Sequence, residues 1–419
     1  MKEKVFKDPI HDHIYVYEPL ILRLIDSYEM QRLRRIKQLG LSYLTYHGAE
    51  HSRFTHSLGS YEIMRLVLGR LEKKNELFLS EREQLLAKAA ALLHDIGHGP
   101  FSHSLEELFE LGHEEWGKRI ILGDSHVNEI LKQQDEKFPS DIAKIIMGEY
   151  NNELINDLIS SQIDVDRMDY LLRDSKITGV NYGEFDLERI IRVMVASEAG
   201  LLFVESGMHS VESYILARYA MYWQVYFHPT TRSAEIVLKK LFERAKDLFE
   251  AGEKLYLPAP LKKLFSGELN IKEYLKFDEP LIYSLFSQWQ EHSDIILSDL
   301  SQRILGRRLF KTTDYQLSQK EIKKLKYLFE QAGIDSKYYL EVDIPSDVPY
   351  DYYRPDSSEK KPIYLKTTTG KKVELSKVSQ LVNSIAGKKK ARKNLYFPRD
   401  FILSKQGQVY KQIEKILFK

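Results

Sequence analysis

Cysteine is missing altogether from this chain of 419 residues. Its absence excludes disulfide bonds, catalysis by a thiolate and zinc sites that use cysteine ligands. A chain without cysteine is also compatible with a reducing compartment. Any metal site in this protein therefore has to be built from histidine, carboxylate or other nitrogen and oxygen ligands.

An excess of charge of either sign is missing as well. The sequence balances 62 Lys and Arg residues against 61 Asp and Glu residues, which gives a formal net charge of +1. Bulk electrostatics therefore give no reason to expect a nucleic acid or an anionic membrane as the main partner. Any anion-binding site has to be a local cluster of basic side chains.

Long apolar runs are the third absence. No stretch of the sequence approaches the roughly 18 uninterrupted apolar residues that a membrane-spanning helix needs. The first residues, MKEKVFKDPIHDH, lack the apolar centre of a signal peptide. We therefore expect a cytoplasmic protein with no membrane partner.

Helical patterning dominates the sequence that is present. A chain of 419 residues is too long for one ordinary core, so we expect two domains or one large domain with an appended piece. Apolar residues recur at helical spacing in the segments 19–38, 56–71, 81–94, 102–111, 114–122, 139–147, 151–161, 165–174 and 208–250. The last segment is interrupted around Pro229. Together these segments predict an all-helical body.

The pattern changes after about residue 305. Segments that are rich in β-branched and aromatic residues and separated by turn signals predict strands there. The predicted strands are 308–312, 338–342, 362–365 and 395–403, and the predicted helices among them are 319–332 and 407–418. We therefore predict a mainly α protein, with an all-helical domain over residues 1–305 and a smaller C-terminal α+β domain over residues 306–419.

The strongest chemical signal is the string HDIGHGPFSH, which occupies residues 94–103 and contains three histidines and one aspartate. His94 and Asp95 lie at a predicted helix end, where adjacent side chains can approach one ion. An imidazole and a carboxylate together suit Mn, Fe, Ni or Zn better than Mg alone. Gly97 and Gly99 allow the backbone to turn tightly and to come close to a ligand.

Two adjacent side chains cannot complete a metal site, so further ligands have to come from other helices. His56 lies upstream in the string RFTHS, and Asp166 lies downstream in the string DVDRMDY. Three- and four-residue spacing gathers polar side chains on one face of the second helix: Asp166, Asp169, Tyr170 and Arg173. A face that mixes acid, base and phenol is a poor match to an apolar core stripe, which favours a functional site.

Five longer strings occur in the order DPIHDHIYV, QRLRRIKQLG, HSRFTHSLG, LLHDIGHGPFSH and IDVDRMDYLLRDS. Within them, His56, His94-Asp95 and Asp166 resemble the H…HD…D signature of the HD phosphohydrolase superfamily. The strings themselves are similar to those of the deoxynucleoside triphosphate (dNTP) triphosphohydrolases related to the vertebrate sterile-alpha-motif-and-HD-domain enzyme and its bacterial counterparts. The resemblance is strong over residues 4–235 and weak over the rest.

The resemblance implies an all-helical HD-domain bundle with its metal core at about residues 50–180 and a C-terminal domain that serves assembly or regulation. It implies that the ligands of a divalent metal (Mn, Mg, Fe, Ni or Zn) are His56, His94, Asp95 and Asp166. Such a metal lowers the pKa of a bound water. The implied reaction is attack at the α-phosphorus of a dNTP, which releases a deoxynucleoside and intact triphosphate.

The resemblance also assigns catalytic roles to three histidines and a carboxylate. His113 and Glu106 match a His–carboxylate pair near the reacting phosphate. His98 and His103 match further histidines on the phosphate or metal side of the site. The ordinary pKa of histidine, which is near neutrality, suits either role.

Substrate-binding positions follow from the same resemblance. Those near phosphate are Arg53, Arg167 and Arg218, those near the sugar are Gln38, Tyr170 and Asp174, and the aromatic residue beside the base is Tyr226. A planar guanidinium binds phosphate oxygens bidentately. A Gln–Asp grip on the 3′-hydroxyl leaves little room for a 2′-hydroxyl, which implies a preference for deoxynucleotides. Base preference stays open, because Tyr222 and Phe227 stand where the vertebrate enzyme carries polar residues.

A second nucleotide site is implied by residues nearer the N-terminus. Asp26, Gln31 and Arg34 match residues that bind a guanine at an allosteric site, and Lys4 and Val5 match the segment beside it. An aspartate can accept from the N1–H and amino groups of guanine, and an arginine can donate to its O6 atom. The implied protein is a homotetramer that dGTP or GTP activates.

Two other classes of function stay open. HD proteins also hydrolyse cyclic nucleotides, alarmones and nucleoside monophosphates, so another phosphate ester is an alternative substrate. A nucleotide-binding or single-stranded nucleic-acid-binding module is the second alternative, and 26 tyrosines and the basic run 388–393 leave nucleic-acid binding open as a secondary activity. Metal retention with release of triphosphate favours the hydrolase, whereas salt-sensitive oligonucleotide binding without turnover favours the module.

Overall fold

The computed structural model describes residues 3–76, 78–101, 104–106, 108, 111–314, 317–343, 361–386 and 393–418. Three features singled out in the sequence lie wholly or partly outside these residues. They are His103, much of the predicted helix 102–111, and the basic run 388–393 except Lys393. The fold and the site are described from the remaining residues.

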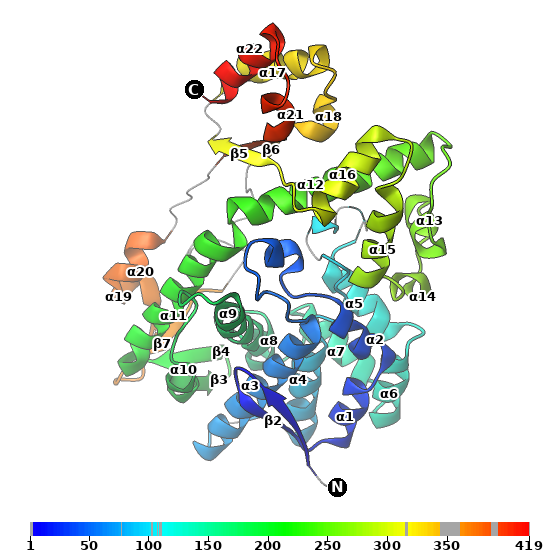
Figure 1. Cartoon of the computed structure of the whole chain (residues 1–419). Helices are drawn as coiled ribbons and strands as arrows, with labels where there is room; N and C mark the ends of the chain where they lie inside the picture. Colours follow the sequence, from blue (N-terminus) through cyan, green and yellow to red (C-terminus); the bar gives the residue numbers. More distant parts are fainter. Residues whose placement is uncertain are drawn as a thin grey trace. The chain divides into compact units, whose positions relative to one another are not determined.

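The chain forms two compact units, and each is assembled from three separate stretches (Figure 1). The first unit consists of Met1–Gln224, Leu269–Glu279 and Tyr350–Lys388, and the second of Val225–Glu268, Pro280–Pro349 and Lys389–Lys419. The predicted boundary at residue 305 follows the sequence pattern, whereas the contacts place residues on both sides of it in the second unit. A division into domains at residue 305 therefore remains a proposal.

The first unit is mainly helical. Its helices are α1 (Pro19–Ile25), α2 (Tyr28–Arg32), α3 (Arg53–Lys73), α4 (Glu81–Leu93), α5 (His113–Leu122), α6 (His126–Gln134), α7 (Phe138–Ile146), α8 (Glu153–Ile159), α9 (Val165–Thr178), α10 (Leu187–Val193), α11 (Met208–Met221), α14 (Ile271–Tyr274), α19 (Leu375–Val378) and α20 (Gln380–Ile385). An N-terminal hairpin pairs β1 (Lys4–Asp8) with β2 (Asp12–Val16). A mixed sheet in the order β3-β4-β7-β8 contains Met194–Ser197, Gly200–Val204, Tyr364–Lys366 and Lys372–Glu374.

The second unit combines helices with a small antiparallel sheet. Its helices are α12 (Pro229–Glu250), α13 (Ala259–Phe265), α15 (Glu279–Trp289, whose first residue ends a stretch of the first unit), α16 (Ile295–Leu305), α17 (Gln319–Gln331), α18 (Ser336–Tyr339), α21 (Arg399–Leu403) and α22 (Gln408–Leu417). The sheet has the order β5-β9-β6, formed by Lys311–Asp314, Asn394–Phe397 and Glu341–Asp343. The predicted mainly α fold with a small sheet-containing C-terminal region is confirmed.

Most long predicted helices are confirmed, with identifiable start signals. Ser80 forms a capping box with Glu83 at the start of α4, and Asp164 caps α9 by accepting from the backbone N–H of Arg167. Pro229 is the first residue of α12, where its missing N–H costs nothing. A π-helical turn, Tyr222–Tyr226, separates α11 from α12.

Three local predictions are wrong. The segment 19–38 is two short helices rather than one, because Ser27 leaves the helical conformation and caps α2 with its side chain. Helix α6 was not predicted at all. The predicted strand 395–403 ends at Phe397, and α21 follows Pro398.

One predicted C-terminal strand lies in the first unit. Strand β7 pairs in parallel with β4, with Phe203 opposite Leu365 and Val204 opposite Lys366. Its other edge pairs with β8 in antiparallel fashion. The C-terminal region therefore supplies strands to both sheets, which a reading of strands along the sequence could not show.

Helix α3 is central to the first unit, because it packs against both α4 and α9. On the α9 side the two backbones approach closely at Gly59. A Cβ atom at this position would lie 1.8 Å from Oδ1 of Asp169 and 2.4 Å from Nη2 of Arg173. Only glycine therefore leaves room for these two charged side chains against α3.

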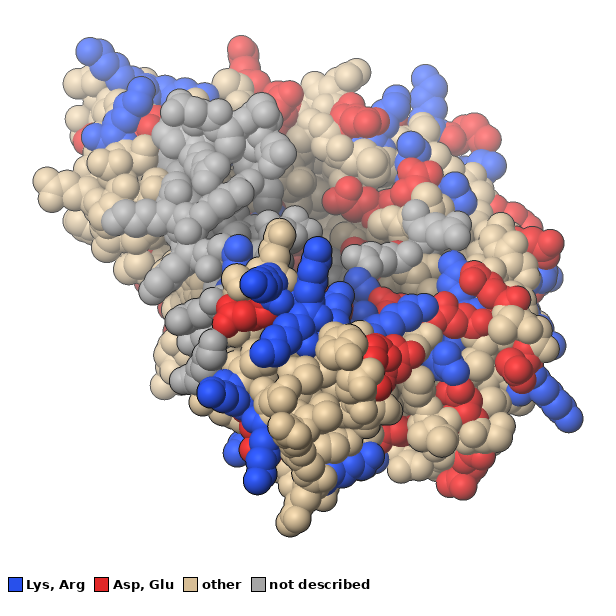
Figure 2. Space-filling view, turned by 90° about the horizontal axis from the view of Figure 1, so that it is seen from above, with Lys and Arg blue, Asp and Glu red and all other residues tan. Residues whose placement is uncertain are grey.

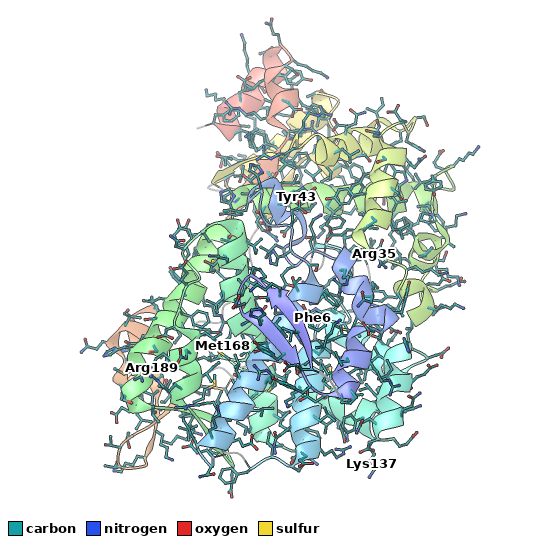
Figure 3. The ribbon with its side chains drawn as sticks, turned by 60° about the horizontal axis from the view of Figure 1, so that its bottom comes forward. Phe6, Arg35, Tyr43, Lys137, Met168 and Arg189 are labelled. Carbon is teal, nitrogen blue, oxygen red and sulfur yellow. The ribbon has the colours of Figure 1, made fainter. Side chains whose placement is uncertain are left out.

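The N-terminal hairpin is fastened to the helix α9. Asp8, the last residue of β1, accepts hydrogen bonds from Nη1 and Nη2 of Arg173 at 2.9 and 3.3 Å. Both side chains are buried, so water does not screen this pair. Figure 3 shows the hairpin that carries Phe6 beside the helix that carries Met168.

The surface carries charge of both signs. Figure 2 shows acidic and basic side chains interspersed over one face of the molecule, in line with the formal net charge of +1. In the described part of the chain, every helix is too short or too polar to span a membrane.

Two glycines of α3 give a matched test of this packing. Gly59→Ala is expected to lower the free energy of unfolding by about 1–3 kcal/mol, because the new methyl group displaces Asp169 and Arg173. Gly69→Ala, where no heavy atom lies within 4 Å, is expected to raise it by about 0.5–1 kcal/mol through helix propensity. Urea denaturation of both variants measures the difference, and equal effects would contradict the packing described.

Candidate active site

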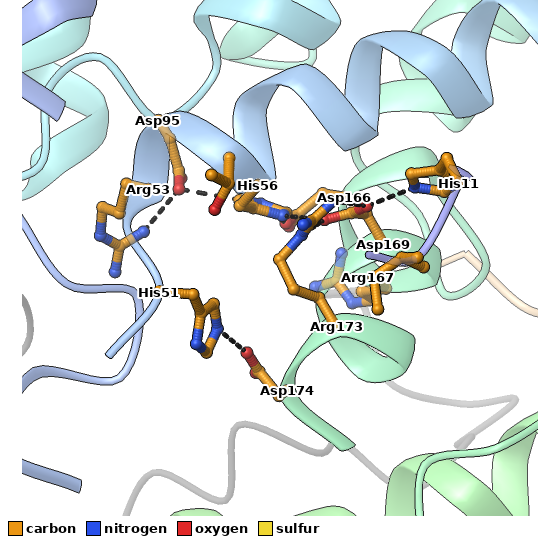
Figure 4. A network of polar contacts seen from close by, with 12 residues as sticks. His11, His51, Arg53, His56, Asp95, Asp166, Arg167, Asp169, Arg173 and Asp174 are labelled. Carbon is orange, nitrogen blue, oxygen red and sulfur yellow. Dashed lines mark hydrogen bonds and ion pairs between the residues drawn. The ribbon is translucent and has the colours of Figure 1, made fainter. Parts of the chain in front are cut away.

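Four side chains from three helices meet in the first unit (Figure 4). His56 lies in the first turn of α3, His94 and Asp95 directly follow α4, and Asp166 lies in the first turn of α9. The Nε2 atom of His56 lies 3.0 Å from Oδ1 of Asp166 and 3.2 Å from Nε2 of His94. Asp95 lies 3.4 Å from Nε2 of His94 and 3.8 Å from Nε2 of His56. The structure thus brings the four predicted metal ligands together.

The spacing of three of these donors fits a single divalent ion, because ligand atoms of His56, His94 and Asp95 all lie within 4.8 Å of one another. At a metal–ligand distance of about 2.1 Å, two donors lie about 3.0 Å apart at a right angle and about 3.4 Å apart at a tetrahedral angle. The separations given above run from 3.0 to 3.8 Å. Two imidazoles and two carboxylates form a mixed nitrogen and oxygen donor set, which suits Mn, Fe, Ni or Zn.

Both imidazoles direct Nε2 into the cluster, because Nδ1 of each ring is engaged elsewhere. Nδ1 of His94 donates to the carbonyl oxygen of Ala91 at 2.9 Å. Nδ1 of His56 donates to Oδ2 of Asp169 at 2.8 Å. Donation from Nδ1 leaves a lone pair on Nε2, which is the tautomer that metal ligation requires.

Asp169 is a buried acceptor that three side chains share. Besides His56, it accepts from Nε2 of His11 at 2.7 Å and from Nε and Nη2 of Arg173 at 2.8 and 2.9 Å. The side chain of His11 is 4% exposed, and those of Asp169 and His56 are fully buried. This carboxylate therefore fixes the ring of His56 from behind the cluster.

Negative charge dominates around the two imidazoles. Burial by itself would lower the pKa of His56, but hydrogen bonds to Asp166 and Asp169 raise that pKa to about 10. The reciprocal bonds from His56 and His94 outweigh burial at Asp166 and hold its pKa well below the usual range. A site that holds a proton this tightly also attracts a metal cation, which competes with that proton.

Asp95 links the metal cluster to neighbouring cationic and neutral groups. Its Oδ2 atom accepts from Nη1 of Arg53 at 2.6 Å, and its Oδ1 atom lies 3.3 Å from Nε2 of His98. Burial opposes ionisation of Asp95, but Arg53, His94 and His98 together outweigh it and hold the pKa of this carboxyl well below its usual range. Burial and the same arginine keep the pKa of His98 low, so His98 is neutral at physiological pH.

A second cluster adjoins the first through His98. The rings of His98 and His113 stack with their centroids 3.8 Å apart at 13°. Nδ1 of His113 bonds to Oε1 of Glu106 at 2.6 Å. The two histidines and Glu106 have donor atoms within 4.8 Å of one another, so three of the four predicted catalytic residues lie together. The fourth, His103, lies outside the described residues.

Buried arginines lie along α9 and α11. Asp164 accepts from the backbone N–H of Arg167 at 2.7 Å and pairs with its guanidinium group. Arg218 on α11 is 1% exposed and donates to the carbonyl oxygen of Gln162 at 3.3 Å. The two guanidinium groups are close enough for the charge of Arg167 to act on Arg218. Two like charges near each other favour binding of a polyanion.

The predicted sugar-side residues lie farther along α9. Tyr170 contacts the hydroxyl of Tyr222 at 3.3 Å, and Asp174 lies one turn beyond Tyr170. Asp174 bonds through Oδ1 to Nε2 of His51 at 2.7 Å, and both side chains are buried. The backbone N–H of Gln38 donates to the carbonyl oxygen of His51 at 2.9 Å, which places Gln38 in the same group.

Sequence reasoning did not assign a partner to His51, and it gave His11 only a structural role. Both bond to carboxylates of α9 that lie more than a hundred residues away, at separations of 123 and 158 residues. The sequence around His11 and around His51 contains other polar residues that could equally well have been the partners of these carboxylates. The two pairs become visible only in the structure, where both α3 and the N-terminal hairpin pack against α9.

Gly97 allows a close contact between two backbone segments. A Cβ atom there would lie 2.0 Å from the carbonyl oxygen of His113 and 2.2 Å from the backbone nitrogen of Gly117. Gly97 therefore allows the turn after α4 to contact the backbone of α5, which begins with His113.

The predicted allosteric residues are only partly linked by described contacts. Gln31 donates to the carbonyl oxygen of Ile25 and accepts from Nε of Arg34, each at 2.8 Å. The guanidinium of Arg34 lies 3.6 Å above the ring centroid of Phe54. Asp26 is exposed at the end of α1.

Three further predicted residues are not placed at a site by the described contacts. Lys4 and Val5 are exposed on β1. Tyr226 ends the π-helical turn and belongs to the second compact unit.

Comparison with known proteins assigns most of the chain to two family models. The model described as HD domain matches residues 53–174, and the model described as HD associated region matches residues 185–411. The first match contains all four side chains of the metal cluster. The second match contains the four-stranded sheet of the first unit, the three-stranded sheet of the second unit and the stretch Leu269–Glu279.

Individual relatives are similar over nearly the whole chain. The protein named Uncharacterized protein YwfO, from Bacillus subtilis, is 51% identical over 96% of this chain and 93% of its own length. The human deoxynucleoside triphosphate triphosphohydrolase SAMHD1 is 28% identical over 96% of this chain and 73% of its own length. The crystal structure of the phosphohydrolase BT4208 from Bacteroides thetaiotaomicron superposes with a TM-score of 0.84 at 30% identity, over 94% of this chain and all of that one. The chain belongs to the HD-domain family and is an HD-domain phosphohydrolase related at modest identity to the SAMHD1 triphosphohydrolases.

Proposed function

We propose that this protein hydrolyses deoxynucleoside triphosphates to a deoxynucleoside and intact triphosphate, with a divalent metal as cofactor. The observation that carries the proposal is the placement of a metal-suited cluster beside an arginine on one helix, where Asp166 is followed by Arg167, whose side chain is only 17% exposed. Such a site attracts a cation and a polyanion at the same time. The relationship to SAMHD1, which is named as a deoxynucleoside triphosphate triphosphohydrolase, supports the choice of substrate.

In this proposal, the metal is held by His56, His94, Asp95 and Asp166. When bound, a divalent ion supplies Lewis-acid activation of water and of a phosphoryl oxygen. Asp169 holds the ring of His56, so that its Nε2 lone pair keeps its direction without a cost of reorganisation at each turnover.

The arginines neutralise the triphosphate. Arg53, Arg167 and Arg218 supply permanent positive charge, and guanidinium groups bind phosphate oxygens in a bidentate manner. Burial strengthens these interactions, because water is largely excluded from Arg218 and its surroundings. The bond that breaks joins the α-phosphorus to the 5′-oxygen of the sugar, so the triphosphate stays in one piece and charge stabilisation along its whole length favours this reaction.

The leaving 5′-oxygen needs a proton when its bond to the α-phosphorus breaks. His113 is the proposed donor, with Glu106 holding Nδ1 and the stacked ring of His98 fixing the plane. Because Glu106 engages Nδ1 of His113, Nε2 is the ring atom that passes a proton to the leaving oxygen in this proposal. His103 joins this group by resemblance alone.

The sugar is proposed to lie toward the C-terminal end of α9. Asp174 is two turns beyond Asp166, about 12 Å along the helix axis at a rise of about 1.5 Å per residue. With Gln38 and Tyr170 it forms the polar wall that binds the 3′-hydroxyl and excludes a 2′-hydroxyl. Tyr226 is proposed to lie beside the base.

Activation and assembly complete the proposal. Lys4, Val5, Asp26, Gln31 and Arg34 are proposed to bind dGTP or GTP at a separate site of a cytoplasmic homotetramer. The hydrogen bond between Gln31 and Arg34 supports this, since it orders two of the polar groups that would face a guanine. The C-terminal domain is proposed to serve assembly or regulation, and nucleic acid is at most a secondary partner.

Product analysis tests the reaction. The wild-type protein with Mn²⁺ or Mg²⁺ is expected to convert dNTPs, with trace dGTP present, to deoxynucleoside and triphosphate in equal amounts by ion-exchange chromatography. Asp166→Asn is expected to lower kcat by about 10³-fold or more, because Lewis-acid stabilisation worth several kcal/mol is lost. The control Asp12→Asn, at a side chain that is 75% exposed, leaves kcat unchanged. Turnover of another phosphate ester without dNTP turnover would contradict the substrate assignment.

Metal binding is tested without turnover. Adding Mn²⁺ to chelator-treated protein is expected to raise its Tm, because a ligand at a hundred times its Kd stabilises the folded state by about 2.7 kcal/mol. His94→Gln removes a ligand and is expected to abolish most of the rise in differential scanning calorimetry. His209→Gln, at a side chain that is 86% exposed, is the control. An equal rise in all three proteins would place the metal elsewhere.

The activator site is tested by kinetics. Trace dGTP or GTP is expected to accelerate hydrolysis of dATP, and Arg34→Ala is expected to reduce this acceleration at least tenfold through loss of a charged hydrogen bond worth about 1.5–3 kcal/mol. Sedimentation velocity of the same samples measures assembly. Full acceleration of the variant would remove Arg34 from the activator site.

A further inference from the structure

A stretch of the HD-associated region belongs to the same compact unit as the metal cluster. Leu269–Glu279 is part of the first unit, although the chain on both sides of it, Val225–Glu268 and Pro280–Pro349, belongs to the second. It lies outside the HD-domain match at residues 53–174. Tyr274 of this stretch contacts the turn that follows the metal ligands His94 and Asp95, and Phe277 binds Arg32, which contacts the same turn.

Three consecutive carbonyl groups of this turn are held by two side chains. Nη1 and Nη2 of Arg32 donate to the carbonyl oxygens of Ile96 and His98 at 3.4 and 2.8 Å. The hydroxyl of Tyr274 donates to the carbonyl oxygen of Gly97 between them at 2.5 Å. Burial raises the pKa of Tyr274 to about 12, so the hydroxyl remains a donor throughout the physiological range.

The ring of Tyr274 is fixed against α5. It stacks on Trp116 with the ring centroids 3.9 Å apart and the planes at 2°. Trp116 lies one turn after His113 on α5, and Gly97 contacts the backbone of the same turn. Tyr274 therefore touches both the turn that carries His98 and the helix that carries His113.

The same stretch also holds Arg32. The Nε atom of Arg32 donates to the carbonyl oxygen of Phe277 at 3.0 Å, so the guanidinium group binds three backbone carbonyl groups. Arg32 is fully buried, and burial lowers its pKa. A buried cation is costly unless its donors are satisfied. Displacement of residues 274–277 would therefore release the turn from both of its clamps.

We propose that Tyr274 is a positioning residue for the metal centre. The hydroxyl group of Tyr274 holds the carbonyl group of Gly97 and so fixes the turn 96–98. A fixed turn in turn fixes the side-chain orientations of Asp95, which precedes it, and of His98, which ends it. Residues that orient metal ligands from outside the ligand shell typically affect metal affinity by about tenfold to a hundredfold. The proposal rests on the metal site of the proposed function and holds for any substrate.

Tyr274→Phe tests the proposal by removing only the hydroxyl group. The dissociation constant of Mn²⁺ is measured by isothermal titration calorimetry on the full chain after chelator treatment. Amide hydrogen exchange of residues 93–101 is measured on the same protein without metal. Tyr327→Phe, at a side chain that is 63% exposed, is the matched control.

The expected result is a Kd for Mn²⁺ about tenfold weaker in Tyr274→Phe, with faster exchange confined to the turn and to the start of α5. The control keeps the wild-type values. A Kd within twofold of wild type would overturn the proposal, whether or not the Tm falls. A general rise in exchange with an unchanged Kd would do the same, because it would show a purely structural role for Tyr274.

Discussion

The buried carboxylate of Asp169 is the interaction on which the arrangement of the metal cluster depends. It accepts from His11 of the hairpin, from His56 of α3 and from Arg173 of its own helix. An uncompensated charge at this depth would destabilise the fold, so each donor is needed. Gly59 provides the space for this carboxylate against α3. One group thereby fixes two helices, the N-terminal segment and the direction of a metal ligand.

Opposite charges are segregated along α9 in a way that suits the proposed chemistry. Asp166 faces the imidazoles of His56 and His94. The guanidinium group of the next residue, Arg167, pairs with Asp164, the residue that caps the start of α9. The carboxylates favour a cation, and the arginines favour a phosphate chain. Because the fold keeps both sets in place without substrate, their stabilising interactions cost little reorganisation during a reaction.

The sequence predicts the parts of this site that are encoded in short strings. His94 and Asp95 are adjacent, and Asp166 lies in a helical face of mixed charge, so their chemistry is visible without a structure. The partnership of His51 with Asp174 and the contact of Tyr274 with Gly97 are not visible, because each depends on packing between segments more than a hundred residues apart. The fold class was predictable from helical spacing. The parallel pairing of β7 with β4 was not, since it is a long-range contact that local composition does not encode.

The proposed reaction is attack of water at the α-phosphorus of a dNTP, for which a metal held by His56, His94, Asp95 and Asp166 would supply Lewis-acid activation. Hydrolysis of dATP in ¹⁸O-water, followed by mass spectrometry of both products, tests it most directly. The account predicts one ¹⁸O atom in triphosphate and none in deoxyadenosine, with loss of both products when the metal is chelated. Label in the deoxynucleoside, or release of orthophosphate or pyrophosphate in place of triphosphate, would contradict it.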